Sequence, residues 1–486
     1  MTIQVSPSPV PNSSTTDKLA SALLDKDAYL SGLLKNVENL SSSLSSSANS
    51  NINIKSNLPW LQELKDNAAK WVRHSSLPST REEEWRFTNL SELREIEFSH
   101  VDGQIISLEE INTLPETPNS RLVFVNGIYA PKLSQVGGLP DGVVVSNLTN
   151  LSEAGHEKVK HYLAHSEGSS EVFTALNTAG IQDVAVILVS KNVVVDTPIS
   201  LVYLSVGNKD NHAIAEDGFY RTIAQPRCLV VAESGSQVNF IEEFGYQETQ
   251  NANKEIKEAK EQTYFCNSVT EIWVEENAGV THTRVTLEGA GAFHIGKTAV
   301  TQERYSRYTC NAVTIGGKLS RHNLEVLQSG EQTETTLNGL SVIFDKQLAD
   351  THSAIALNYP HGITNQLHKT IVGDKAHGVF NGKVFVPKPA QLTNAAQLNR
   401  NLLLSPKARI DTKPQLEITA DNVKCAHGAT VSQLEDDEIF YLQSRGIDEN
   451  AARHLLINAF AGEIIDKIPV ASLQERLMET VKSVSG

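Results

Sequence analysis

Short runs in which β-branched or aromatic residues alternate with polar ones constrain the fold of this chain more than any other feature. They fill the region beyond about residue 120, for example at 236–244 (SQVNFIEEF), 280–289 (VTHTRVTLEG) and 378–386 (GVFNGKVFV). Alternation with a period of two is typical of strands, and the Gly, Asn and Asp residues between the runs are typical of turns. Because no helical segment long enough for a parallel crossover separates the runs, the pattern disfavours a doubly wound α/β sheet.

Two all-β architectures fit such a region: a sandwich or barrel, and a solenoid in which each coil of chain adds strands to the coil before it. Both place alternate residues on inner and outer faces, so the alternation is compatible with either. At 486 residues the chain can bury a large core, either as two or three structural parts or as one elongated unit.

Helical periodicity marks both flanks of this region. Leucines at three- and four-residue steps indicate one helix between residues 17 and 40, and a second helix is predicted from Trp60. The helical period returns after Thr430, where Asp448 is a predicted N-cap. The predicted parts, in chain order, are a mobile N-terminus at 1–16, an N-terminal helical region at 17–119 with a Ser/Asn-rich linker at 41–56, a strand-rich core at 120–433 with a charged insertion at 251–262, and a C-terminal helical region at 434–486.

Charge and cysteine usage narrow the possible functions. The chain has 42 Lys and Arg against 57 Asp and Glu, a net charge of −15, so we expect no nucleic-acid or anionic-membrane partner. The first twenty residues show neither a secretory signal nor an Arg-rich transit peptide, and the longest apolar run, 184–189, is too short to cross a bilayer. We therefore expect a cytoplasmic or plastid-stromal protein. Its four widely spaced cysteines are predicted to be reduced thiols: Cys228, Cys266, Cys310 and Cys425.

Residues 291–298 (GAFHIGKT) match the phosphate-loop pattern of nucleotide hydrolases, and Asp345 could act as the metal-holding acid of such an enzyme. A working loop of this kind lies between a buried strand and the N-terminus of a helix. Here the flanking sequences, THTRVTL and AVTQERYSRYTC, are typical of half-exposed strands. We therefore predict that the match is accidental and that this chain binds no nucleotide.

Cys425 and His427 form a Cys-x-His pair inside a predicted strand. Alternate residues of a strand share a face, so both side chains could bind one ion, although zinc and iron–sulfur centres generally need three or four protein donors. Ordinary packing, or a thiolate nucleophile with His427 as its base, are the alternatives. Four further histidines fit no ligand motif and are predicted to be surface or packing residues: His352, His361, His368 and His377.

Four phrases between residues 378 and 447, NLLLS, DTKPQLEI, CAHGATV and FYLQSRGI, closely resemble the SufB/SufD family of the SUF iron–sulfur cluster assembly system. Residues 77–90 (LPSTREEEWRFTNL) are similar to the N-terminal signature of that family. The resemblance extends from about residue 60 to the end of the chain. The phrase CAHGATV has the form found in the SufD branch.

The resemblance implies a mainly β fold, in which a right-handed parallel β-helix core lies between N-terminal and C-terminal helical regions. It also implies a non-catalytic scaffold subunit of a SufBCD complex, which assembles iron–sulfur clusters and transfers them to apo-proteins. The β-helix edge would pair with SufB, helices within 434–466 would dock the ATPase SufC, and ATP hydrolysis would occur in SufC.

His427, with Cys425 as second choice, is the candidate ligand that the resemblance implies for a transient cluster shared with SufB. The other three cysteines have no motif support and are predicted to lie in the core. Two rival functions are compatible with parts of the sequence: a polysaccharide-active β-helix enzyme, which would need clustered carboxylates or calcium, and an autonomous phosphate-loop ATPase. The absence of a visible secretory signal and the family phrases favour the scaffold.

Overall fold

The computed structural model describes residues 26–36, 58–99, 111, 113–166, 171–206, 221–247 and 263–485. The N-terminus at 1–16, the linker at 41–56 and the insertion at 251–262, all predicted from the sequence, lie outside these ranges.

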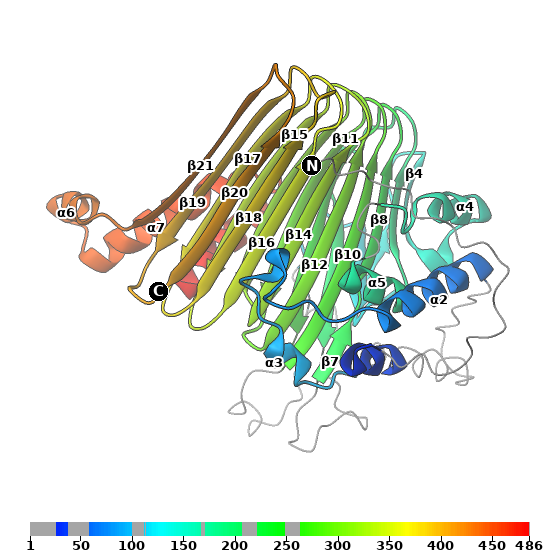
Figure 1. The fold of residues 1–486 in the computed structure, drawn as a ribbon, viewed down its shortest axis with the longest axis horizontal. Coiled ribbons are helices and arrows are strands. Elements are labelled where there is room, and N and C mark those ends of the chain that lie inside the picture. Colours follow the sequence, from blue (N-terminus) through cyan, green and yellow to red (C-terminus); the bar gives the residue numbers. More distant parts are fainter. Residues whose placement is uncertain are drawn as a thin grey trace.

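Two long and mostly parallel sheets form the body of the chain (Figure 1). Within the described residues, the eleven strands of sheet 1 are β1 (Ser120–Val125), β2 (Ile128–Tyr129), β3 (Gln135–Val136), β6 (Ile199–Val206), β9 (Gln237–Gln247), β11 (Gly279–Glu288), β13 (Arg307–Gly316), β15 (Glu334–Ile343), β17 (Ile363–Val372), β19 (Asn394–Leu403) and β21 (Lys424–Gln433). The ten strands of sheet 2 are β4 (Val143–Asn147), β5 (Ala185–Val189), β7 (Arg221–Ala224), β8 (Arg227–Ala232), β10 (Thr263–Val274), β12 (Ala292–Gln302), β14 (Leu319–Gln328), β16 (Leu348–Ala356), β18 (His377–Val386) and β20 (Arg409–Ile418).

Consecutive strands from β8 onward alternate between the two sheets, and each pairs in parallel with the strand two places further along the chain. The chain therefore winds as a parallel β-solenoid, as the family resemblance implied. Antiparallel pairs join β1 to β2 and β3, and β4 to β5, at the N-terminal end of the body. The sandwich or barrel that the alternation also allowed is wrong, because its sheets would be antiparallel throughout.

Each of five successive coils turns through one residue in the left-handed backbone region. The backbone N–H of each of these residues donates to a carbonyl of the next coil, so the corners stack on one another. The donor–acceptor pairs are Asn277 to Arg304, Tyr305 to Glu331, Gln332 to Pro360, His361 to Gln391, and Leu392 to Asn422. The repeated corner gives these five coils the same turn, which keeps the strands of neighbouring coils in register.

The N-terminal helices cover the outer face of sheet 2 (Figure 1). They comprise residues 28–36, α2 (Pro59–Arg73), α3 (Ser91–Arg94), α4 (Glu153–Tyr162), α5 (Val172–Ala179) and the 3-10 turns η1 (Glu83–Trp85) and η3 (Leu148–Asn150). Residues 77–90, which resemble the N-terminal signature of the SufB/SufD family, pack on this face. Thr88 donates to Asp350, and the guanidinium of Arg321 lies 3.9 Å from the centre of the Trp85 ring.

Three helices follow the last strand: α6 (Asp436–Ser444), α7 (Glu449–Ile465) and α8 (Ala471–Val484). The predicted N-cap of α7 is confirmed, because the Asp448 carboxylate accepts from the Ala451 N–H at 3.1 Å. Within α7, Ile457 and Ile464 are buried in one cluster with Val313 and Leu340 of sheet 1.

Part of the apolar surface of residues 434–466, the region expected to dock SufC, thus packs on this chain's own core. In contrast, α6 stands clear of the solenoid beyond β21 (Figure 1), and it exposes 71% of Phe440 and 57% of Tyr441. None of the helices in the described ranges combines the length and apolar character needed to cross a bilayer.

Candidate metal centres

The solenoid ends in an open coil. Strands β20 and β21 are the terminal strands of their sheets, and each pairs with one neighbour, β18 or β19. Cys425 and His427 both lie on β21, two positions apart, so they share one face. Their register partners on β19 are Ala395 and Gln397, which are buried. The prediction that the two residues share a face of one strand is confirmed, and the structure places that face on the inside of the last coil.

The two side chains differ in environment. Cys425 is half-buried and packs against the main core, whereas His427 is exposed. Burial raises the pKa of the Cys425 thiol, although a hydrogen bond with the Ala395 backbone opposes this shift. Binding a metal through Cys425 must therefore release a proton from a thiol that favours its neutral form.

The open end holds too few donors for a complete site. Across the described ranges, one group of three or more His, Cys, Asp or Glu side chains has its donor atoms within 4.8 Å of one another, and it comprises Cys266, Glu288 and His294. Cys425 and His427 belong to no such group. This chain thus offers two donors at its edge, where a zinc or iron–sulfur centre generally needs three or four.

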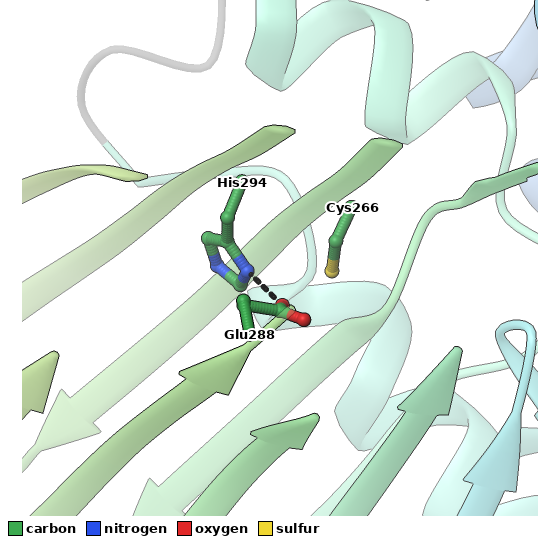
Figure 2. Close-up of side chains that lie close together, drawn as sticks. All are labelled: Cys266, Glu288 and His294. Atoms are coloured by element: carbon green, nitrogen blue, oxygen red, sulfur yellow. Dashed lines mark hydrogen bonds and ion pairs between the residues drawn. The ribbon is translucent and has the colours of Figure 1, made fainter. Parts of the chain in front are cut away.

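The group of three lies deep inside the solenoid and joins both sheets (Figure 2). Cys266 of β10 and His294 of β12 are register partners in sheet 2, and Glu288 comes from the end of β11 in sheet 1. The Nδ1 atom of His294 lies 2.7 Å from Oε1 of Glu288. These are chemically suitable ligands for zinc or iron.

Hydrogen bonds within the protein already occupy most of these donor atoms. Tyr264 donates to Oε2 of Glu288 at 2.6 Å, and Nη2 of Arg284 lies 2.7 Å from Nε2 of His294. Since a guanidinium can only donate, Nε2 of His294 is the acceptor, and Nδ1 carries the proton shared with Glu288. Burial and the Arg284 charge lower the pKa of His294, in keeping with this neutral ring.

The thiol of Cys266, the third member of the group, is also protonated. Burial, reinforced by the Glu288 charge, raises its pKa well above the ordinary value, so the thiol is neutral. A metal would have to remove that proton and displace Arg284. The three side chains are therefore better explained as a satisfied polar network than as a resident metal centre.

Sequence reasoning placed Cys228, Cys266 and Cys310 in the core, and all three are buried. It missed the grouping of Cys266 with Glu288 and His294. The strand alternation could have indicated that each side chain points inward, but the contact crosses between two sheets, and no spacing within one strand encodes it.

The phosphate-loop alternative is wrong, because residues 291–298 do not form a loop. Nearly all of them belong to strand β12, which is followed by another strand, β13. Lys297 pairs with Glu325 at 2.8 Å on the outer face, whereas Gly296 faces Arg284 on the inner face. A backbone in this extended form cannot direct successive N–H groups at a phosphate.

The four unassigned histidines are scattered, as expected of surface or packing residues. His361 is an exposed corner residue, and His368 is buried inside the solenoid, where burial lowers its pKa to about 4. The Nε2 atoms of His352 and His377 lie 2.9 and 2.7 Å from carboxylate oxygens of Asp350 and Asp411.

Comparison with known proteins decides the family. The SufBD core domain of the SUF system for iron–sulfur cluster assembly matches residues 212–460, and the SufBD N-terminal region matches residues 40–201. The chain belongs to the SufBD family. An iron–sulfur cluster assembly SufBD family protein of Synechocystis is 48% identical over 421 residues, which cover 86% of this chain and 89% of that protein.

Two further SufBD relatives come from a plant and a bacterium. Protein ABCI7, chloroplastic, of Arabidopsis thaliana is 34% identical over 93% of this chain and 90% of its own length. The iron–sulfur cluster assembly protein SufD of Escherichia coli is 30% identical over 84% of this chain and 89% of its own length. These matches give this SufBD chain a role in iron–sulfur cluster assembly and favour it over the polysaccharide-active alternative.

Proposed function

We propose that this chain is a non-catalytic scaffold subunit that supplies part of the ligand set for a cluster built between two subunits. The supporting observation is that the solenoid ends, within the described residues, in a strand with one free edge, and that this strand carries a thiol and an imidazole on its inner face. The partner in this proposal is a SufB-like subunit of a SufBCD complex, which would supply the missing donors. The cluster, the cargo of the complex, passes from there to apo-proteins.

The free edge of β21 is suited to pairing with another solenoid. An exposed strand edge presents unpaired N–H and C=O groups, and proteins that must stay apart usually block such edges with proline, bulges or charges. β21 has the sequence KCAHGATVSQ, with no proline and one charged residue, Lys424. β20 contains Pro414, which removes one N–H from its strand. We therefore infer that β21 forms the main contact with the partner.

His427 is the first-choice ligand and Cys425 the second. The imidazole is exposed and can bind a metal without leaving a packed environment, whereas the thiol is half-buried and favours its protonated form. A ligand set divided between two subunits can be opened by a small movement of one against the other. Such lability suits a protein that must release its cluster.

Helices α6 and α7 are the proposed docking site for a SufC-like ATPase. Phe440, Tyr441 and Leu455 are exposed there, at 71%, 57% and 49%. Burying apolar surface contributes roughly 25 cal/mol per Å² before the cost of association. ATP hydrolysis would then belong to the partner, with no nucleotide bound by this chain.

The predicted parts of the chain have matching roles in this proposal. Residues 120–433 would form the assembly scaffold, and residues 434–486 would form the ATPase-docking region. Residues 17–119 would cover and stabilise sheet 2. The relatives include a bacterial protein and a chloroplastic one, which supports a cytoplasmic or plastid-stromal location.

Anaerobic reconstitution of the complex co-expressed with its SufB-like and SufC-like partners tests this function. His427→Ala should lower cluster absorbance at least several-fold, and Cys425→Ser should lower it less, because the imidazole is the more accessible donor. His361→Asn is the control, since it alters an exposed histidine at a corner of the solenoid. Full loading of the His427→Ala complex would contradict the proposal.

A further inference from the structure

His427 is the outermost member of a column of side chains that runs through the solenoid. Register pairs connect it to Gln397 on β19, and Gln397 to Gln366 on β17. All three residues point to the inside. The two positions that precede His427 in this column, one in each of the two coils before it, thus both carry an amide side chain.

Gln397 is buried and has no hydrogen-bond partner in the part of the chain that the structure describes. It is 3% exposed, and neither Oε1 nor Nε2 makes a hydrogen bond. Leaving a buried polar group unpaired costs about 1–3 kcal/mol, so proteins rarely retain one without a use. Gln366 differs, because its Oε1 accepts from Ser353 at 2.8 Å.

Gly382 creates the space in which the Gln397 amide lies. A Cβ at position 382 would be 2.2 Å from Nε2 of Gln397. The Gln397 side chain therefore reaches across the interior from sheet 1 to sheet 2. The register partners of Gly382 and Gln397 in the last coil are Pro414 and His427. The amide thus forms the floor of the open end.

We propose that Gln397 is a positioning residue for His427. A metal-bound imidazole uses one ring nitrogen, and the N–H of the other nitrogen nearly always donates to a nearby acceptor that fixes the ring. The unpaired Oε1 of Gln397 is available as such an acceptor, and the backbones of Gln397 and His427 are register partners one strand spacing of about 4.8 Å apart. This inference rests on the proposed role of His427 as a cluster ligand.

Two substitutions of Gln397 separate the effect of its acceptor oxygen from the effect of its side-chain length. Gln397→Met keeps the length of the side chain and removes the acceptor, whereas Gln397→Glu retains an acceptor oxygen. In the reconstituted complex, we expect chelator to remove the cluster about tenfold faster from the Met variant. The Glu variant should recover most of the difference. Gln366→Met, one coil deeper, is the matched control and should leave the rate unchanged.

A spectroscopic readout tests the hydrogen bond itself. In the reduced, paramagnetic complex, pulsed EPR measures the quadrupole coupling of the remote ring nitrogen of a histidine ligand, which depends on the hydrogen bond from its N–H. Gln397→Met should change this coupling, and Gln366→Met should not. Gly382→Ala, which places a methyl group where the amide lies, should act like Gln397→Met.

The outcomes distinguish the two proposals. If His427→Ala removes the nitrogen coupling while Gln397→Met leaves both the coupling and the chelation rate unchanged, Gln397 is only a packing residue, and this inference is wrong. If the complex shows no nitrogen coupling that depends on His427, the proposed function fails first. A shared loss of thermal stability in Gln397→Met and Gln366→Met, with an unchanged coupling, would also assign the two amides to a structural ladder.

Discussion

Buried acids and bases balance one another inside the solenoid. The Glu242 carboxylate lies 2.9 Å from Nε2 of His282 and accepts from Thr270 at 2.8 Å, and Arg284 lies close to Glu242 and donates to His294. Glu242 and Glu288 supply two negative charges, and Arg284 and protonated His282 supply two positive ones. Such a set is stable only when complete, because removing one member leaves another charge buried without a counter-charge.

The pH dependence of stability should reveal the charge on His282. Burial favours the neutral ring, but hydrogen bonds and charges from Cys310 and Glu242 outweigh burial and raise the pKa of His282 from 6.5 to about 9. A raised pKa stabilises the fold fully below pH 6.5 and loses this contribution as the pH rises through 9. We expect the unfolding free energy to fall by about 3 kcal/mol over this range for this group alone.

Urea unfolding at several pH values, compared between the natural chain and His282→Gln, isolates this effect. The glutamine cannot titrate, so the difference in stability between the two proteins should shrink as the pH rises from 6.5 to 9. A difference that stays constant across this range would show that His282 is neutral in the folded chain.

For single residues, the sequence predicted which side chains are buried better than it predicted which other residues they contact. Cys228, Cys266 and Cys310 fit no motif and were predicted to lie in the core, and all three are buried. The contacts of Glu288 with His294 and of Gln397 with the space above Gly382 depend on how two sheets face each other. That relation is set by the length of each coil, which a local pattern does not specify.

The corners are the repeating element that closes each coil. Some of them have residues that are poorly suited to the left-handed backbone conformation. A residue other than glycine or asparagine in the left-handed region costs roughly 1 kcal/mol. Leu392 has a φ of 60° and is 50% exposed, so its side chain gains little from packing. Its N–H nevertheless donates to Asn422 at 2.7 Å and helps to hold the last coil.

Replacing Leu392 with asparagine should therefore stabilise the chain. Asparagine tolerates the left-handed region, and we expect a gain of about 0.5–1 kcal/mol, measured as a higher urea midpoint. Asn277 already occupies the equivalent corner several coils earlier and provides a natural precedent. A lower midpoint for Leu392→Asn would mean that the leucine side chain makes a stabilising contact that its exposure does not suggest.

These corners also explain why the sequence left the solenoid and the sandwich unresolved. Turn prediction depends on Gly, Asn, Asp and Pro, but the corners of successive coils include Tyr305, Gln332 and Leu392. The strands were predictable because alternation is local. The way in which the strands are connected depends on the stacking of one corner on the next, which no local pattern encodes. The family resemblance, and not the local pattern, therefore predicted the solenoid.

At the scale of the whole molecule, two surfaces have no covering element among the described residues: the free edge of β21 and the exposed aromatic surface of α6, together called the uncovered surfaces. The N-terminal helices cover sheet 2, and α7 packs on sheet 1, but α6 stands beyond the last coil (Figure 1). Both uncovered surfaces lie near the C-terminal end of the solenoid. This arrangement would bring an ATPase close to a shared cluster.

Charge substitutions on α6 should weaken binding of the SufC-like partner. Phe440→Glu and Tyr441→Glu replace exposed aromatics that we expect to be buried on docking, and a loss of at least tenfold in affinity is expected for each. Trp71→Glu is the matched control, since Trp71 is 51% exposed on α2, far along the chain. Equal affinities in a quantitative pull-down, with the fold intact by circular dichroism, would remove α6 from the docking site.

The proposed function requires above all that a second subunit completes the open end of the solenoid through β21. Hydrogen–deuterium exchange of the chain, alone and bound to its SufB-like partner, measures this directly. Roughly half of the backbone N–H groups of a parallel edge strand have no partner until another strand is added. We predict that exchange in residues 424–433 slows at least tenfold on binding. Unchanged exchange in 424–433, with protection appearing on another face of the chain, would contradict the account.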